Sequence, residues 1–435
     1  MLVDSAVVRL LIATAAAAVT ALAFGGNAWA TEQTFVFQYG PVKLGPYDVV
    51  RGTRIAPSPQ LDGYITGMKA QIVNAQGGVE PPNHVMLHHV VFAKIGVHDY
   101  TCSRFVDLDG HSVPALAERF FGVGEEHHML DLPASYGYPS LASQPWALTY
   151  MLMNHGKQPR TVYVRYEVRY VVDEPRTAVR PIWLDVRNCL SDPVWDVPGV
   201  GRKGSEFARH ADYRMPESGR IVAGLGHLHG GAVRLELSDR TCSRNLFTFQ
   251  PTWGGPMPMP LMHEPGPSHM SNFTTETGMP VAKGDVLRLN AVYANDSPHT
   301  RVMGISLAYF VPGAVSGCPA LPSDVSVDLG HPGPPPHIVV PLMRRPRGPL
   351  VRARGASVVD FGFHAERVLV RAGTLFRWRF LGAAQHDVTL ANGPVGFSSP
   401  SVSSGTFTHR FGRRGVYHLF CSLHPTRMTQ TVIVR

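Results

Sequence analysis

Short runs in which β-branched or aromatic residues alternate with polar ones recur along the chain, and no other feature constrains the fold as strongly. They include TVYVRYEVRYVV at 161–172, GAVRLEL at 231–237, DVLRLNAVYA at 285–294, GISLAYFV at 304–311 and TQTVIVR at 429–435. Successive side chains of a strand point to opposite faces, so a period of two predicts half-buried strands. The segments between these runs draw on 43 glycines and 37 prolines, residues that favour turns. The sequence therefore predicts an all-β protein built from β-sandwiches.

The chain is too long for one core, and its length favours two to four domains. Residues 319–354 are rich in proline, which an interior strand tolerates poorly, and this stretch predicts a semi-rigid linker. A weaker break lies near Glu174 and Pro175. We therefore expect a first sandwich over 31–174, a second over 175–318, the linker over 319–354 and a third sandwich over 355–435.

Residues 1–30 have the order of a secretory signal: Arg9 near the start, a small and apolar run, and the A-x-A site Ala28-Trp29-Ala30. Cleavage before Thr31 would give an extracytoplasmic protein, periplasmic or secreted. The alternative is an uncleaved anchor, because the apolar run is near spanning length, and only then would the protein associate with a membrane.

The formal charge of +8 is spread along an arginine-rich chain, and no basic cluster is interleaved with stacking aromatic residues. This distribution argues against a nucleic-acid partner. The sequence sets no oligomeric state.

An odd number of cysteines in an exported protein suggests disulfides plus one thiol kept for chemistry. The five are Cys102, Cys189, Cys242, Cys318 and Cys421. We expect Cys102 to pair with Cys189 and Cys242 with Cys318, of which the second pair stays within one expected domain, although four cysteines allow three pairings. Cys421 is expected to remain a free thiol.

The C-terminal stretch CSLHPTRM places three soft metal ligands close together, Cys421, His424 and Met428. A thiolate, an imidazole and a distant thioether form the ligand set of a blue-copper electron-transfer site. Such a site needs a second imidazole, and His386 stands at the edge of an expected strand upstream. His409 and His418 are interpreted as packing or surface residues. The alternative is a buried free cysteine beside a core histidine and methionine.

These four residues and the strands around them resemble the cupredoxin family, over roughly the last 80 residues. The resemblance implies a Greek-key β-sandwich that holds one type 1 copper through His386, Cys421, His424 and Met428. Multicopper oxidases and copper nitrite reductases typically flank the copper cysteine with histidines, whereas here the neighbours are Phe420 and Ser422. This difference argues against that class of enzyme.

Further histidines precede the linker in LHHVVF, MLMNHG and GHLHGG. His227 and His229 would share one face of a strand and could bind one ion. The adjacent His88 and His89 would point to opposite faces unless a bulge turns one of them round.

This pattern resembles the ascorbate-dependent type II copper monooxygenases, such as peptidylglycine α-hydroxylating monooxygenase, and implies two jelly-roll-like sandwiches. The resemblance implies an electron-storing copper at His88, His89 and His155. It also implies a catalytic, oxygen-activating copper at His227, His229 and Met303. Leu225 and Leu307 stand where that family has a substrate-binding arginine and a tyrosine, so peptidylglycine is not the expected substrate. The alternative is a structural sandwich whose histidines bind no metal.

The region 34–313 also resembles the stress up-regulated nodulin family, in motifs such as FQYGPVKLGPYDV, LPASYGYP and KGDVLRLNAVYANDSPHTRVMGISLAYF. This resemblance adds little to the mechanism. EEHHM at 125–129 is interpreted as surface. The Met- and His-rich loop at 256–270 is either a Cu(I)-binding loop or a flexible cover.

Two functions follow from these patterns, and both are copper redox chemistry outside the cytoplasm. In the first, the C-terminal domain supplies electrons to a dicopper monooxygenase-like centre that oxidises or hydroxylates a small-molecule substrate with O₂. In the second, a non-catalytic protein transfers electrons to a redox partner or handles copper, and the front region is a binding module. Copper is the expected cofactor in both, one type 1 ion with or without two more in the front region.

Overall fold

The computed structural model describes residues 32–82, 84–106, 111–253, 264–330 and 344–435, and within these all regular secondary structure is β-strand. The prediction of an all-β protein is confirmed. None of these residues forms a helix long and apolar enough to span a membrane. The predicted signal segment, 1–30, lies outside the described residues.

The first sandwich contains ten strands in two facing sheets: β1 (Gln33–Leu44), β2 (Val49–Ala56), β3 (Gly63–Asn74), β4 (Val85–Ile95), β7 (Ala117–Gly124), β8 (Leu130–Asp131), β9 (Tyr136–Ser140), β10 (Trp146–Asn154), β11 (Arg160–Val171) and β12 (Thr177–Ala178). One sheet has the order β1–β11–β3–β9–β12 with β8 beside β3, and the other has the order β2–β10–β4–β7. In β11, Val164, Tyr166 and Val168 are buried and the residues between them are partly exposed, as their alternation predicts. The Tyr166 ring meets Phe92 of the other sheet at 4.7 Å between ring centroids.

The second sandwich is built mainly from nine strands: β13 (Arg180–Asp185), β15 (Glu206–Arg214), β16 (Gly219–Leu228), β17 (Ala232–Asp239), β18 (Arg244–Phe249), β21 (Asn272–Val281), β22 (Val286–Ala294), β24 (Gly304–Pro312) and β25 (Ser326–Asp328). Its sheets have the orders β13–β24–β16–β21–β25 and β15–β22–β17–β18. Three two-stranded ladders lie outside the main sheets: β5 (Arg104–Val106) with β6 (Ser112–Pro114), β14 (Trp195–Val197) with β23 (His299–Val302), and β19 (Pro251–Thr252) with β20 (His269–Met270).

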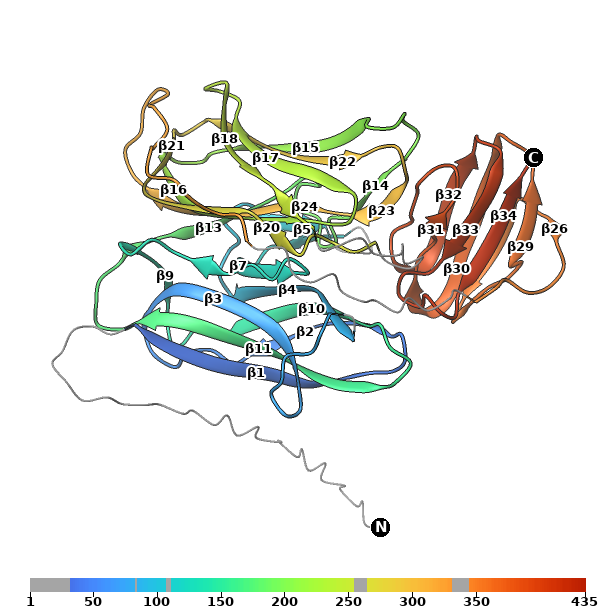
Figure 1. Cartoon of the computed structure of the whole chain (residues 1–435), viewed down its shortest axis with the longest axis horizontal. Helices are drawn as coiled ribbons and strands as arrows, with labels where there is room; N and C mark the ends of the chain where they lie inside the picture. Colours follow the sequence, from blue (N-terminus) through green and yellow to red (C-terminus); the bar gives the residue numbers. More distant parts are fainter. Residues whose placement is uncertain (1–31, 83, 107–110, 254–263, 331–343) are drawn as a thin grey trace, which may run out of the picture.

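The C-terminal sandwich contains nine strands: β26 (Val351–Arg352), β27 (Gly355–Val359), β28 (Gly362–Phe363), β29 (Arg367–Val370), β30 (Thr374–His386), β31 (Thr389–Asn392), β32 (Val402–Phe411), β33 (Gly415–Phe420) and β34 (Thr429–Val434). Its sheets have the orders β26–β29–β34–β33–β31 and β28–β27–β30–β32. Its core is aromatic, and the buried Trp378 indole donates a hydrogen bond to Gln430 at 2.8 Å. In Figure 1 this sandwich, in orange and red, stands beside the ends of the other two.

The two front sandwiches share part of one core. Strand β24 is buried on both faces: Leu307 and Tyr309 belong to the apolar cluster of the first sandwich, whereas Ala308 and Phe310 belong to that of the second. The alternation of side chains along a strand explains this division. The Tyr309 hydroxyl also donates to the Phe120 carbonyl at 2.8 Å across the interface. The two front sandwiches therefore pack as one unit, one above the other in Figure 1.

Sheet pairing moves two of the expected boundaries. The short strand β12 pairs with β9, so the first sandwich reaches Ala178 rather than residue 174. Strand β25 pairs with β21, so the second sandwich extends to Asp328, inside the stretch interpreted as a linker. Residues 331–343 of that stretch lie outside the described part of the chain.

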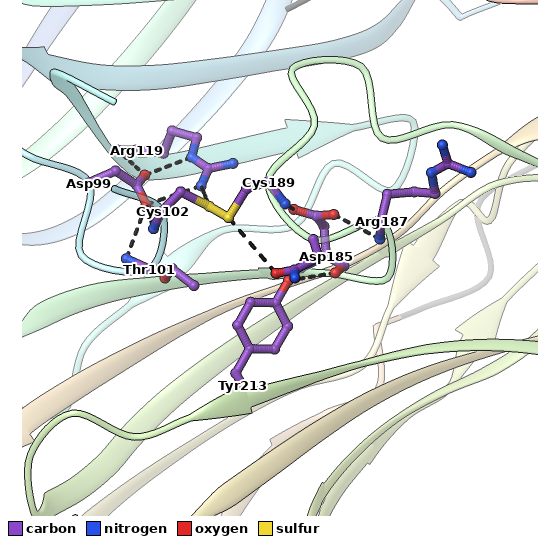
Figure 2. Close-up of a disulfide and its surroundings, with 9 residues drawn as sticks. Asp99, Thr101, Cys102, Arg119, Asp185, Arg187, Cys189 and Tyr213 are labelled. Atoms are coloured by element: carbon purple, nitrogen blue, oxygen red, sulfur yellow. Dashed lines mark hydrogen bonds and ion pairs between the residues drawn. A yellow bond between two sulfur atoms is a disulfide. The ribbon is translucent and has the colours of Figure 1, made fainter. Parts of the chain in front are cut away.

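Both predicted disulfides are present, Cys102–Cys189 and Cys242–Cys318, and Cys421 is a buried free thiol. The first bridge crosses a domain boundary. Cys102 follows β4 of the first sandwich and Cys189 follows β13 of the second, so this bridge joins two domains. Figure 2 shows the bridge between Asp99 and Asp185, whose carboxylates accept hydrogen bonds from the backbone N–H groups of Cys102 and Cys189 at 2.9 and 3.2 Å.

Candidate metal centres

The C-terminal ligand residues meet at one end of their sandwich. Strand β30 ends at His386 and β33 ends one residue before Cys421. The Cys421 thiol lies 3.9 Å from His386 Nδ1 and 3.6 Å from His424 Nδ1. Met428 is fully buried in the same core, and its backbone carbonyl accepts a hydrogen bond from the Cys421 N–H at 3.2 Å. The four residues singled out in the sequence are therefore brought together.

Asp360 sets the orientation of the His386 ring. Its carboxylate accepts hydrogen bonds from the backbone N–H groups of Ala384 and Ala383, each at 3.0 Å, and from His386 Nε2 at 3.1 Å. These bonds lower the pKa of Asp360 to about 2, so it is ionised and only accepts. His386 Nε2 must therefore carry the proton, and Nδ1, facing the thiol, is the ligand atom.

The Cys421 environment suits a bound cation. Burial, and then the nearby charge of Asp387, raise the pKa of the thiol well above its usual range. A thiolate would form there only with a positive charge beside it, as a metal ion provides. The Asp387 N–H donates to the sulfur at 3.4 Å, and its carboxylate accepts from the Ser422 N–H at 2.9 Å. This donor set fits the copper that the sequence predicts.

A second cluster forms where the two front sandwiches meet. His88 and His89 of β4 lie with their Nδ1 atoms 3.1 Å apart. The ladder between β4 and β10 pairs His89 with Met151 and Leu87 with Leu152, which skips His88. His88 is therefore the extra residue of a β-bulge, and the bulge turns adjacent rings toward each other. This is the bulge that two adjacent histidines need if both rings are to bind one metal ion.

The pair His227 and His229 comes from the second sandwich and faces the first pair. Its Nε2 atoms lie 3.2 Å apart, and the His88 and His229 rings lie 5.0 Å apart between centroids. His229 Nδ1 donates to the Arg301 carbonyl at 3.0 Å, and His227 Nδ1 donates to Glu126 at 3.1 Å. Because these partners can only accept, both rings direct Nε2 toward the cluster, as in metal-binding histidines held by an outer acceptor.

Glu126 and His128 are the residues that sequence reasoning missed. His128 was interpreted as surface, yet it is buried and its Nε2 lies 2.7 Å from the Gly122 carbonyl. Burial alone would raise the pKa of Glu126, but the charge and hydrogen bond of His227, together with His128, hold it below its usual range. This buried anion raises the pKa of His227 against the effect of its own burial. The same negative charge would favour a metal cation there.

His89 differs from His227. Burial and the charge of His227 lower the pKa of His89 to about 4, so its ring is neutral near pH 7. A neutral imidazole is the form that binds a metal.

Met303 and His155, the other two predicted ligands, occupy different surroundings. Met303 is buried, lines the same cavity as the four histidines and precedes β24. His155 follows β10, and its Nδ1 lies 3.2 Å from the Pro82 carbonyl. It is absent from the described residues that line the cavity. The two histidine pairs meet at the His88 and His229 rings and are named together here the histidine cluster (His88, His89, His227 and His229), although among the described residues no three of their ring nitrogens lie within 4.8 Å of one another.

One cavity of about 600 Å³ reaches from the histidine cluster to the residues that flank Cys421 in the C-terminal sandwich. Its walls come from all three sandwiches and include Arg51 and Tyr150 of the first, and Leu225 and Leu307 of the second. The C-terminal sandwich contributes Phe420 and Ser422, which lie on either side of Cys421 in the sequence, and Leu423, which precedes His424. Residues 256–263 of the Met- and His-rich loop lie outside the described part of the chain.

No family model matches the chain, and no curated protein does either. Among solved structures, a purple cupredoxin from Nitrosopumilus maritimus is 23% identical over 19% of this chain and 100% of its own length, with a TM-score of 0.18. The Cu(I) form of an amicyanin mutant is 23% identical over 19% of this chain and 82% of its own, with a TM-score of 0.18.

A Cu-containing nitrite reductase from Thermus scotoductus SA-01 is 14% identical over 54% of this chain and 58% of its own, with a TM-score of 0.17. Identities and TM-scores this low carry no argument for a shared function. The chemistry of the two centres therefore rests on the side chains described above.

Proposed function

We propose that this chain is an exported copper redox protein with a blue-copper electron-transfer centre in its C-terminal sandwich. The centre supplies electrons to copper in the histidine cluster, where O₂ oxidises or hydroxylates a small substrate. The observation that carries the proposal is the convergence of His386 Nδ1 and His424 Nδ1 on the buried Cys421 thiol. Copper bound there would supply one-electron chemistry.

The residues of the C-terminal centre have separate roles. Asp360 holds the His386 ring, and Asp387 donates to the sulfur and fixes the Cys421–Ser422 backbone. The Phe361 ring packs edge-on against the His424 ring, with 4.9 Å between centroids. A site held rigidly in this way changes little between the two oxidation states of its metal, which favours rapid electron transfer.

The cavity beside the histidine cluster favours an enzyme over a protein that only transfers electrons. Its volume is within the range of small-molecule sites. Apolar side chains such as Trp183, Leu225 and Leu307 form much of its wall. The two leucines replace the arginine and tyrosine that the monooxygenase resemblance would require, which favours a small apolar substrate over a peptide. They also favour the second candidate, electron transfer or copper handling without turnover.

The first test is spectroscopic. The copper-loaded protein should show an intense visible band from thiolate-to-copper charge transfer, and Cys421→Ser should abolish it. His418→Ala, on the exposed face of β33, should leave the band unchanged. A wild-type protein with full copper content and no visible band would contradict the C-terminal assignment.

The second test counts copper. Wild type should bind more than one copper per chain, and His227→Ala with His229→Ala should remove front copper while the blue band stays. A wild-type stoichiometry of one would rule out the front centre.

A third test measures turnover. It should appear as reductant-dependent O₂ uptake that is lost in Met303→Ala and kept in His127→Ala.

A further inference from the structure

Arg301 connects the two centres through hydrogen bonds in both directions. Its carbonyl accepts from His229 Nδ1 at 3.0 Å, at the histidine cluster. Its guanidinium donates to the Ser399 carbonyl of the C-terminal sandwich at 3.3 Å and to Asp192 at 2.9 Å. The residue lies on β23, and its side chain is mostly buried.

The connection continues to the Cys421 sulfur. The Ser399 hydroxyl accepts from the Val388 N–H at 2.9 Å. One residue earlier, the Asp387 N–H donates to the Cys421 thiol at 3.4 Å. Four hydrogen bonds and the covalent bonds between them therefore lead from Cys421 through Asp387, Ser399 and Arg301 to His229.

The backbone of Arg301 is held in an unusual conformation. Its φ is +54°, in the left-handed region that is unfavourable for a residue with a side chain. The Arg301 N–H donates to Asp196 at 3.0 Å, and the same carboxylate accepts from the Ser398 hydroxyl at 2.8 Å. In this conformation the Arg301 carbonyl points to His229, and the Arg301 side chain reaches Ser399 of the C-terminal sandwich. Backbone strain of this kind at a domain junction indicates a functional constraint.

Other contacts hold the C-terminal sandwich in the same place. The Thr300 hydroxyl donates to the Leu390 carbonyl at 3.1 Å, and the Gly396 N–H donates to the Pro198 carbonyl at 2.9 Å. Arg51 of the first sandwich bonds Gln385, next to His386. The junction is therefore a set of specific hydrogen bonds around Arg301.

We propose that Arg301 is the positioning residue that couples the two centres, because it docks the C-terminal sandwich and completes a bonded route for single electrons. This inference rests on the proposed function. With copper bound at both centres, the Cys421 centre would hold the one-electron donor and the histidine cluster the one-electron acceptor, so that the electron lost by one copper is the electron gained by the other. No proton moves and no bond breaks, and a one-electron donor protein or small reductant recharges the C-terminal centre.

The test compares Arg301→Met, Arg301→Lys and Arg288→Met. Arg288 pairs with Asp212 at 2.7 Å within the second sandwich and serves as a control with the same loss of charge. Flash reduction of the C-terminal copper bleaches the blue band, and its recovery reports the rate at which the electron moves on. Arg301→Met should slow this recovery by roughly tenfold or more with the band intensity and potential unchanged, because it removes one bonded step. Arg301→Lys should recover part of the rate, and Arg288→Met should match wild type.

Small-angle X-ray scattering of the copper-free variants supplies a second readout. An expanded particle for Arg301→Met supports the docking role, and a wild-type shape with slowed recovery supports the bonded route. Wild-type recovery together with a wild-type shape in Arg301→Met would overturn the inference. If wild type itself shows no recovery, the proposed function fails and the inference fails with it.

Discussion

Gly124 shows how closely the two front sandwiches approach each other at the histidine cluster. A Cβ atom on this residue would lie 2.7 Å from the His88 carbonyl oxygen, 2.9 Å from His227 Cε1 and 3.0 Å from a Glu126 carboxylate oxygen. The carbonyl belongs to the backbone of the bulge, so it cannot move aside cheaply. Glycine is therefore required for the cluster to close.

We expect Gly124→Ala to lower the free energy of unfolding by about 1–3 kcal/mol, as overpacking of an interior does. It should also weaken front copper binding, because the added methyl group pushes His227 away from His88. Urea unfolding and copper counting would measure the two effects, and the blue band should not change.

Gly313→Ala is the matched control, since a Cβ there meets nothing within 4 Å. If Gly124→Ala binds copper as wild type does, the close approach of the two sandwiches does not determine the site.

Individual residues also mark what sequence reasoning could and could not find. Cys421, His424 and Met428 were identifiable because they lie in one short loop with the spacing of a known ligand set. Glu126 was not, because its role depends on a turn of the first sandwich meeting β16 of the second, a contact between residues 101 positions apart. The four consecutive ionisable residues at 125–128 were the available signal. The burial of Glu126 and His128, which gives these two residues their chemistry, is a tertiary property.

At the scale of the element, strands were predictable wherever one face is buried and the other is solvated. Strand β11 follows this rule, and its alternation was visible in the sequence. The bulge at His88 was not predictable, because register is set by pairing with β10 and β7, not by the sequence of β4 itself. The histidine cluster depends on that register.

Strand β32 carries a pH-sensitive packing contact. The His409 ring stacks on Phe397, with 3.7 Å between centroids and 12° between planes. Burial lowers the pKa of His409 to about 4. Between pH 4 and the usual pKa near 6.5 the unfolded chain therefore binds more protons at this residue than the folded chain, and stability rises with pH. The contribution is present above pH 6.5 and is lost as the pH falls toward 4.

We predict that His409→Phe will flatten the loss of stability between pH 7 and pH 5, because phenylalanine keeps the stack and takes up no proton. The difference in slope should stay below about 1.4 kcal/mol per pH unit, the limit for one proton, since the ring is only partly buried. Urea unfolding of both proteins at the two pH values would measure it. His409→Gln should show the same flattening at lower overall stability, and equal slopes in all three proteins would refute the assignment.

At the scale of the whole molecule, the sequence predicted the all-β fold class but not how the sandwiches share their surfaces. The run GISLAYFV reads as an ordinary buried strand, whereas β24 serves two cores at once. The pairing of Cys102 with Cys189 was predicted, but the contact between the sandwiches that it joins was not, because cysteine spacing contains no information about which sandwiches face each other. These shared surfaces form where the sandwiches dock, and the docking also encloses the cavity between the histidine cluster and the residues that flank Cys421.

The Cys102–Cys189 bridge is expected to hold that docking. It closes a loop of 87 residues, and Arg119, which lines the cavity, binds Asp99 beside it at 2.8 Å (Figure 2). Replacing both cysteines with alanine should lower the free energy of unfolding by roughly 2–5 kcal/mol and weaken front copper binding, because the two sandwiches can then separate.

The control is Cys242→Ala with Cys318→Ala, which opens a comparable loop of 76 residues inside the second sandwich. This control should lose similar stability and keep the front copper at temperatures where the protein is folded. Thermal unfolding would measure the loss of stability in both double variants, and copper titration would measure their copper affinity. Equal copper affinity in the two would show that the Cys102–Cys189 bridge stabilises the chain without positioning the histidine cluster.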